Sequence, residues 1–495
     1  MNKILLSLYG LVILSLFSCA INRSAYHPDK KFSQAVLQKE YILLRTILEK
    51  KHPSLYWYTP KDSMDIYFGQ SYAKIKDSMT EQQFVWKIIA PLIHQIHCGH
   101  TSVSMSKAYS KWANRRELPS FPYFLKVWND TMAVTGQLNK NDSIFKRGTV
   151  INSINGKNAQ SLLPVLFNYM SQDGYEENNN FIRISSNFPY YHRNVFGLSK
   201  VYQIEYKDSL GKVYSVALPA YFPPKDSTKK NKFTPEVVKI PKQNRMNEYR
   251  SFEIDSTKKF AVMKVNTFSA GRLRSFFRKS FKTLRKNNIP HLVLDMRING
   301  GGKVNASTLL TKYISRKPFK VSDSLYAVTK NLGRYTKYIK GNFLNNIELL
   351  FICKKRKDGY FHLTNYENKL YLPKKRNHYS GKVYVLINGP TFSAACLFAN
   401  AVKGQSGITL LGENTGGGWY GNNGIMIPEI ILPSTGVRVR LPLFRLIQFQ
   451  HQQIKGTGIV PDVYIGTDYQ ALKMGYDKKL RWIKEQLIRG AEIKL

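Results

Sequence analysis

Residues 381–418, GKVYVLINGPTFSAACLFANAVKGQSGITLLGENTGGG, change from an apolar strand to a helix within a few positions. Residues 383–387 have the length and β-branched composition of a buried strand. Asn388-Gly389-Pro390 interrupts this run, and residues 394–399 are predicted to be helical. Ser393 is therefore expected at the first turn of a helix, near free N–H groups and the positive end of the helix dipole.

Ser393 has two interpretations at this point. An activated serine needs such a setting, because the alkoxide and the oxyanion that it creates are both negative. Alternatively, Thr391 or Ser393 only caps the helix, which is the commoner role of a hydroxyl at this position. On the local pattern alone, the cap is the favoured interpretation.

A second strand ends in a run of glycines. Residues 291–295, HLVLD, read as a buried strand, and residues 296–302, MRINGGG, follow directly. Three glycines let backbone N–H groups approach a ligand without hindrance from side chains. Upstream, residues 260–265 form a strand pattern and Leu273 begins an apolar helical stripe. The order strand, helix, strand predicts a right-handed βαβ unit and a largely parallel sheet.

Together, LDMRINGGG and NGPTFSAA…LLGENTGGG resemble peptidase family S41, the tail-specific and tricorn-type serine proteases. Typical members carry LDLRxNxGG, a TxSA-type nucleophile and GExTGG in this order. The resemblance implies a ClpP/crotonase-like α/β catalytic core over residues 251–470, in a multidomain α/β protein. It makes Ser393 the expected nucleophile, and the N–H groups of Ala394 and of Gly300 or Gly301 the expected oxyanion donors. The implied reaction is hydrolysis of a peptide or protein substrate without a cofactor, and nothing in the sequence resembles a zinc site.

The chain has 495 residues, enough for two to four domains, and a formal charge of +43 from 75 basic and 32 acidic residues. The electric field of such a charge favours anionic partners such as membrane surfaces or acidic peptides. We favour a generally basic, solvated surface, because the charge is spread over the whole chain. No nucleic-acid-binding motif accompanies the charge. The oligomeric state is left open by the sequence.

The N-terminus resembles a bacterial lipoprotein signal. Residues 1–3 are a short basic start, residues 4–17 are apolar, and residues 16–19, LFSC, resemble a lipoprotein box. We expect a signal peptide over residues 1–18, lipidation of Cys19, and a tether over residues 19–32. The protein would then be a lipid-anchored lipoprotein of the outer membrane or periplasm; an ordinary signal peptide with an incidental cysteine is the alternative.

A helical N-terminal domain is expected over residues 33–115. Leu37, Tyr41, Leu44 and Leu48 share one helical face. Thr80 and Gln83 form a capping-box pattern before a second amphipathic helix, and that helix runs into residues 97–101, HCGHT.

In the tricorn-like branch of the family, a DGHT or SHT stretch at this place supplies the catalytic histidine, and His100 occupies the matching position. A neutral imidazole is a suitable proton acceptor for a serine hydroxyl. A purely structural His100 is the alternative. His94, His97 and His451 are rivals, although His94 and His97 lie one turn apart and suit packing or capping roles better.

Residues 117–222 read as a β-rich domain. Asn129-Asp130 joins two strand patterns in a hairpin. Residues 147–156, RGTVINSING, resemble the GDxIxxINGxxV stretch of PDZ domains, and residues 161–167 would be the PDZ helix. This PDZ-like domain would either bind an extended chain end by strand addition or only brace the core, and both remain open.

Three further segments were assigned from composition. Residues 223–250 are predicted to be a basic linker, and residues 317–378 an insertion with two basic runs. We favour a solvated insertion over a basic lid or a lipid-facing surface. Residues 471–495 are expected to form a C-terminal helix that starts near Asp468.

The resemblance also exposes gaps. The Ser–Lys version of the mechanism places a lysine where this chain has Gly418. The histidine version uses a late glutamate, where Lys455 stands beside Gln452 and Gln453, and a second serine, which is Gly99 here. Loss of the orienting group can lower the rate by up to ~10⁴-fold. We therefore left open a slow enzyme, a different orienting group, or a non-catalytic relative that binds peptides or lipophiles, as retinoid-binding members of the fold do.

Two predictions concern supporting residues. After loss of residues 1–18, an odd number of unpaired internal cysteines argues against a disulfide framework, and Cys396 is expected to be a packed residue. Asp295, Arg297 and Glu413 are expected to support the two motif loops structurally.

Overall fold

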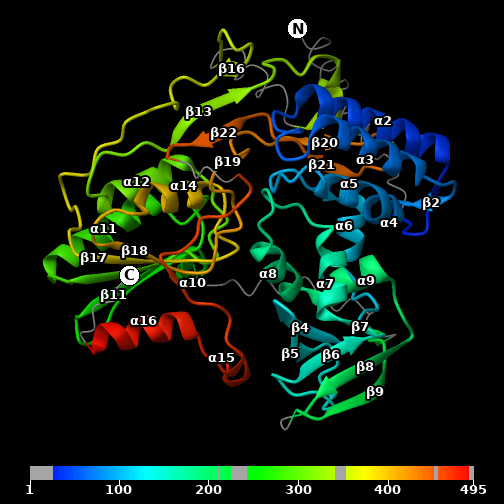
Figure 1. Cartoon of the computed structure of the whole chain (residues 1–495), viewed down its shortest axis with the longest axis horizontal. Helices are drawn as coiled ribbons and strands as arrows, with labels where there is room; N and C mark the ends of the chain where they lie inside the picture. The colour runs from blue at the N-terminus through cyan, green and yellow to red at the C-terminus, as the bar shows by residue number, and fades with distance from the viewer. Residues whose placement is uncertain (1–25, 209–210, 225–241, 341–352, 451–454, 490–495) are drawn as a thin grey trace, which may run out of the picture.

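The computed structural model of this chain describes residues 26–208, 211–224, 242–340, 353–450 and 455–489. The α/β core, which begins near residue 250, lies on one side of the molecule, and the N-terminal helices and the β-rich middle domain lie on the other (Figure 1). The predicted lipidation site Cys19, the rival His451, and Gln452 and Gln453 fall outside the described residues. Within the described ranges, no helix is both long and apolar enough to span a bilayer.

The core is built on one six-stranded sheet with the order β10-β11-β12-β17-β18-β23. All neighbours from β11 to β23 pair in parallel, and β10 adds an antiparallel edge. The βαβ unit and the largely parallel sheet are thus as predicted. The strands are β10 Arg250–Ile254, β11 Phe260–Val265, β12 His291–Asp295, β17 Lys382–Ile387, β18 Ile408–Gly412 and β23 Val463–Tyr464.

Helices cover both faces of this sheet, which is why its strands are apolar throughout. One face packs against α11 (Leu273–Lys286), α12 (Val304–Ile314) and α14 (Ala394–Val402). The other face packs against α16 (Lys478–Ile488), which contributes Ile483 and Leu487 to a second buried cluster. The apolar stripe of α11 is buried as its spacing predicts.

The N-terminal region is helical, as expected. Its helices are α2 (Gln34–Lys51), α3 (Lys61–Ala73), α4 (Glu81–Phe84), the π-helical turn η1 (Val85–Ile89), α5 (Ala90–His94) and α6 (Lys107–Ala113). The short β1 (Lys31–Phe32) and β2 (Met79–Thr80) pair beside them. Thr80 and Gln83 form the reciprocal capping box before α4. These helices share their buried core with strands from much later in the chain.

The segment 317–378 is not a solvated insertion, so that prediction is wrong. Its β14 (Ile339–Lys340) belongs to the sheet β14-β20-β21-β3, with β20 (Glu429–Ile431), β21 (Arg438–Arg440) and β3 (Val103–Ser104). Its β13, β15 and β16 form a second sheet with late strands. Leu325, Leu332 and Leu363 are buried in the same cluster as the N-terminal helices. The second sheet contains β15 Lys354–Lys355, β16 Phe361–His362, β13 Ser322–Ala327, β22 Arg445–Gln448 and β19 Gly421–Asn422.

The middle domain is a sheet with the order β4-β5-β6-β8-β9, and β7 pairs with β6. The predicted hairpin is present, with Trp128 opposite Thr131. Two helices, α8 and α9, fill a stretch that we expected to be mostly strand. The elements are β4 Tyr123–Trp128, β5 Thr131–Gln137, β6 Val150–Ile154, β7 Lys157–Asn158, α7 Ala159–Phe167, α8 Asn178–Ser186, α9 Phe188–Phe196, β8 Val201–Lys207 and β9 Val213–Pro219.

The predicted C-terminal helix and the predicted basic linker also differ from the structure. The C-terminal segment contains two helices, α15 (Tyr469–Met474) and α16, because Gly475 adopts φ +75° and ends the first helix. The predicted linker ends in a helix, α10 (Lys242–Tyr249), which leads directly into β10.

Candidate active site

Ser393 lies at the sharp turn between β17 and α14, half-buried, with φ +53° and ψ −122°. This backbone conformation is costly for a residue with a side chain and is concentrated at functional turns. The side chain of Ser393 does not cap α14. Thr391 does not cap it either, because its hydroxyl donates to the carbonyl of Met296 and accepts from the N–H of Asn388. Neither capping interpretation holds, and the Ser393 hydroxyl remains available for chemistry.

His100 meets Ser393 from the opposite side of the site. It lies in the loop between α5 and β3, and its ring packs 4.9 Å from that of Phe392, centroid to centroid. A Cβ placed on Gly424 would lie 2.6 Å from Ser393 Oγ and 2.8 Å from His100 Nε2, so these two atoms are separated by at most the sum of the two distances. Unliganded catalytic pairs are often this loose and tighten when substrate binds.

The rival histidines have structural partners. His94 Nδ1 lies 2.8 Å from the carbonyl of Met170, and His97 Nδ1 lies 2.9 Å from the carbonyl of Gly174. Both rings therefore tie the end of the helical region to the middle domain. Of the three histidines in this described segment, only His100 faces the serine.

The environment of His100 favours the neutral ring. Burial and, as the smaller cause, the positive charge of Arg440 lower its pKa to about 3. Its Nδ1 is buried and has no hydrogen-bond partner among the described residues. The imidazole is thus ready to accept a proton at Nε2, but no carboxylate there stabilises the imidazolium that would form.

The glycine loop after β12 abuts the nucleophile. Phe392 N–H donates to the carbonyl of Asn299 at 3.1 Å, and a Cβ on Gly301 would lie 2.9 Å from the nitrogen of Ala394. Gly301 cannot serve as an oxyanion donor in this conformation, because its N–H donates to Asn299 Oδ1 at 2.9 Å. The N–H groups of Gly300 and Ala394 have no acceptor within the described part of the chain, so they are the available pair.

The family model "Peptidase family S41" matches residues 259–465. The match covers less than half of the chain, and the matched segment is called the S41 domain below. This segment is therefore similar to serine-type peptidases of that family. No curated protein matches the chain.

Solved structures share the fold of the whole chain. Mature CPAF complexed with lactacystin aligns with a TM-score of 0.63 and 15% identity, over 92% of this chain and 99% of that one. Mature CPAF aligns with a TM-score of 0.62 and 14% identity, over 92% and 98%. The tricorn protease also matches, at 13% identity over 92% of this chain and 37% of that one, but with a TM-score of 0.39. At these identities the likeness to CPAF establishes the fold.

Charged residues near the S41 motifs have structural roles, as expected. Arg297 bridges Asp295 at 2.7 Å and Asp477 at 2.6 Å, which fixes the end of β12 against the start of α16. Glu413 pairs with Lys479 of α16 at 2.7 Å. Cys396 is fully buried in the core of the S41 domain, and Cys98, Cys353 and Cys396 are all free thiols.

Sequence reasoning missed Asp173. It lies in the loop after α7 of the middle domain, is 3% exposed, and reaches the S41 domain. A lone acid in the polar stretch Ser171-Gln172-Asp173-Gly174 looks like an ordinary surface turn, so no sequence signal distinguishes it. No group of three His, Cys, Asp or Glu side chains in the described ranges is arranged to hold a metal ion.

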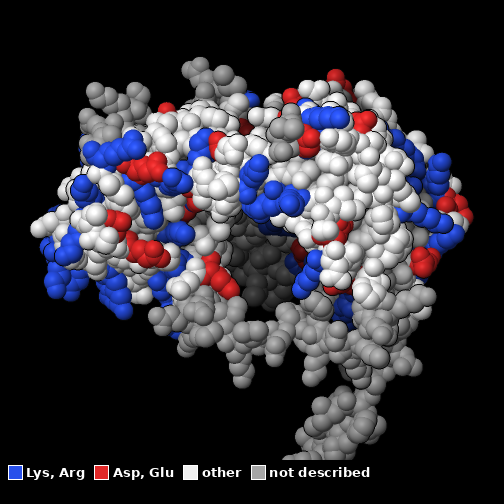
Figure 2. Space-filling model, turned by 90° about the horizontal axis from the view of Figure 1, so that it is seen from below, with Lys and Arg blue, Asp and Glu red and all other residues white. Residues whose placement is uncertain are grey.

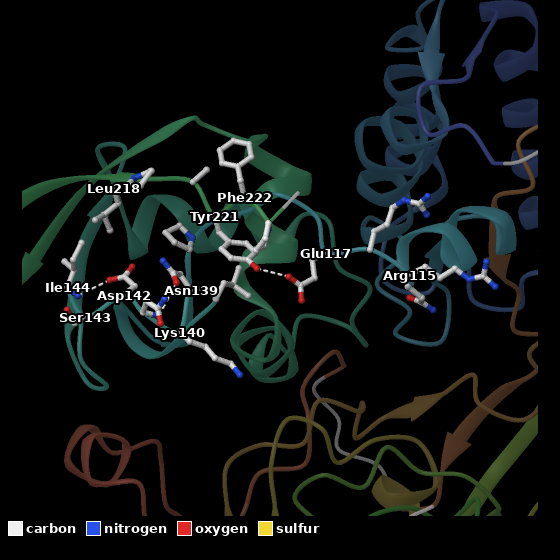
Figure 3. Close-up of a pocket in the computed structure, with 18 residues that line it drawn as sticks. Arg115, Glu117, Asn139, Lys140, Asp142, Ser143, Ile144, Leu218, Tyr221 and Phe222 are labelled. Atoms are coloured by element: carbon white, nitrogen blue, oxygen red, sulfur yellow. Dashed lines mark hydrogen bonds between the residues drawn. The ribbon is translucent and has the colours of Figure 1, made fainter. Parts of the chain in front are cut away.

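One cavity lies away from Ser393. It measures about 1160 Å³, and loop residues 138–144 and the end of β9 line it at the edge of the middle domain (Figure 3). Tyr221 donates to Glu117 at 2.7 Å across its wall. From below, the surface is also hollowed between the two sides of the molecule, and Lys and Arg side chains gather at the rim (Figure 2).

Proposed function

We propose that this protein is a serine peptidase in which Ser393 is the nucleophile and His100 is the general base. One observation carries the proposal: Ser393 Oγ and His100 Nε2 face each other across Gly424, at the first turn of α14. The left-handed backbone of Ser393 and the absence of a capping hydrogen bond support it, because they leave the hydroxyl exposed to a substrate carbonyl.

The reaction follows from these positions. Ser393 Oγ attacks the carbonyl carbon of a peptide bond, and His100 Nε2 takes the hydroxyl proton. The N–H groups of Ala394 and Gly300 hold the resulting oxyanion. His100 then gives its proton to the leaving amine nitrogen as the C–N bond breaks. Water hydrolyses the acyl ester on Ser393 and restores the hydroxyl.

A serine-directed fluorophosphonate tests the nucleophile. We expect it to label the wild type, and to leave Ser393→Ala unlabelled. Ser406→Ala is the matched control, because Ser406 is an exposed serine of the same domain. Labelling of the Ser393→Ala variant at the wild-type rate would contradict the assignment.

A second function, non-catalytic binding of a peptide or lipophile in the same cleft, is favoured by one observation. His100 Nδ1 lacks an acceptor and Arg440 opposes protonation of the ring, so the base is weak. A wild type that binds peptides but shows neither labelling nor cleavage would support this function. A scaffold that acts through the PDZ-like domain would instead tolerate Ser393→Ala in a pull-down experiment.

The proposed place of action is the cell envelope, with the protein anchored through lipid on Cys19 and cleaving envelope proteins or peptides. The support is the lipoprotein-type start of the sequence. Metabolic labelling with a fatty acid should mark the wild type and spare Cys19→Ala. A wild type that incorporates no fatty acid would contradict the anchor.

A further inference from the structure

The buried carboxylate of Asp173 joins three parts of the chain. Its Oδ1 accepts the N–H of Gly99 at 2.7 Å, and its Oδ2 accepts the N–H of Gly418 at 3.3 Å. Within the described ranges no lysine, arginine or histidine pairs with it. A buried carboxylate without a cation is expensive, so the two N–H groups are its main stabilisation.

The two donors belong to opposite halves of the candidate active site. Gly99 directly precedes His100 in the sequence. Gly418 ends the glycine loop that packs behind the nucleophile, where a Cβ on Gly417 would lie 3.2 Å from the nitrogen of Ser393. One side chain therefore holds both the loop of the base and the loop behind the nucleophile.

The surroundings leave little freedom at this junction. A Cβ on Gly99 would lie 2.5 Å from Phe392 and 3.1 Å from Asp173 Oδ1. The neighbouring Gly174 donates its N–H to the carbonyl of His97 at 2.9 Å and accepts from His97 Nδ1. The loop that carries Asp173 thus contacts the histidine loop at three points.

We infer that Asp173 is the positioning residue that sets the His100–Ser393 geometry, and that its ionised form is the one that does so. This inference rests on the proposed function. The ionised carboxylate offers an acceptor oxygen to each loop. Once protonated, it turns one oxygen into an O–H donor that faces an N–H donor, and one of the two connections is lost.

A pH dependence follows. Burial raises the pKa of Asp173 to about 7, while the hydrogen bonds from Gly99 and Gly418 act in the opposite direction. The titratable groups that face it are Tyr58, Cys98 and Cys396, and burial raises the pKa of all three, so none of them becomes charged near neutral pH. His100 has its pKa lowered to about 3, so a fall in activity near pH 7 would come from Asp173.

The test compares Asp173→Asn with the wild type and with Glu177→Gln, an exposed acid four positions further along. Asparagine has the same shape but only one acceptor oxygen. We expect the fluorophosphonate labelling rate of Asp173→Asn to fall about 10- to 100-fold, the range for losing a hydrogen bond to a charged group. The loss of activity below about pH 7 should disappear in this variant. KM for a peptide substrate should change less than kcat. The thermal midpoint should stay equal or rise, because a buried charge is removed.

Amide hydrogen exchange provides a second measurement that needs no catalysis. Relative to intrinsic exchange, peptides that cover residues 97–100 should be protected in the wild type above pH 7 and less protected below it. They should exchange faster in Asp173→Asn and not in Glu177→Gln. Unchanged exchange, or an acid-side fall in activity that persists in Asp173→Asn, overturns the inference. Changed exchange in a protein that is never labelled at Ser393 instead overturns the proposed function.

Discussion

The peptidase core and the N-terminal helical region contribute to one site in different ways. The core supplies Ser393 and Gly300 at the ends of neighbouring parallel strands, so short contiguous motifs place them. The helical region supplies His100 from a loop that is fixed by contacts to the middle domain and to late strands. The proposed nucleophile and oxyanion donors are therefore positioned by local motifs of the core, whereas the position of the proposed base depends on how three parts of the chain are assembled.

Replacing the proposed base, His100, is expected to reduce the reaction rate most. In His100→Ala, we expect the labelling and cleavage rates to fall about 10²- to 10⁴-fold, because general-base assistance is removed while the core motifs stay intact. His94→Ala is the control, since His94 Nδ1 hydrogen-bonds the carbonyl of Met170 and its ring packs against His97, away from Ser393. Steady-state kinetics on a peptide ester measure the effect. Equal losses in both variants would mean that the helical region acts through folding alone.

A variant that separates Ser393 from His100 but keeps both side chains tests whether their distance matters. Gly424→Ala inserts a methyl group between Ser393 Oγ and His100 Nε2, and we expect the rate to fall about 10²-fold. Gly69→Ala is the matched control, because a Cβ there meets nothing within 4 Å. Thermal midpoints of both variants should stay near the wild type. Full activity of Gly424→Ala would show that the two groups do not act together.

Low pH should destabilise the helical region, because its buried histidines resist protonation in the folded state. This effect is expected to be smaller than the effects of the two substitutions above. Burial lowers the pKa of His52 from 6.5 to about 3, so the unfolded chain binds a proton below pH 6.5 and the folded chain does not. The stability that neutral His52 contributes is complete above pH 6.5 and is lost as the pH falls toward 3. Asp173 acts in the opposite sense, because its raised pKa makes its contribution complete below pH 3.8 and lost as the pH rises through about 7.

The measurement is thermal unfolding at pH 7.5 and pH 5. Relative to the wild type, His52→Gln should lose about 2 kcal/mol less stability between these two values, since one linked proton is removed. The exposed His27→Gln is the control. If both variants lose the same stability as the wild type on acidification, His52 is not a source of the acid sensitivity.

The sequence predicted the core better than its surroundings for physical reasons. Buried parallel strands are continuous apolar runs, and Gly, Asn or Pro marks the turn after each one. The strands β12 and β17 and their loops could therefore be predicted from the sequence. The strands β13 and β14 pair with β22 and β20, which lie about a hundred residues further along the chain, and no local pattern reveals such partners.

The candidate active site also has features that the sequence predicts and features that it does not. Ser393 and His100 could be identified because their neighbours resemble family motifs, but the left-handed backbone of Ser393 and the occupied N–H of Gly301 are properties of the folded loops. Asp173 could not be found, since its role depends on burial and on two backbone donors that lie 74 and 245 positions away.

The pairing of β3 with β21 has a consequence for how the protein matures. Val103 pairs with Val439, and the N–H of Arg440 donates to the carbonyl of Ser102, close behind His100. During synthesis the chain must therefore reach residue 440 before the histidine loop gains this support, well after Ser393 has been made. A nascent or truncated chain that ends earlier carries Ser393 with an incompletely supported His100 loop, so the proposed catalytic pair is fully supported only when synthesis is nearly complete.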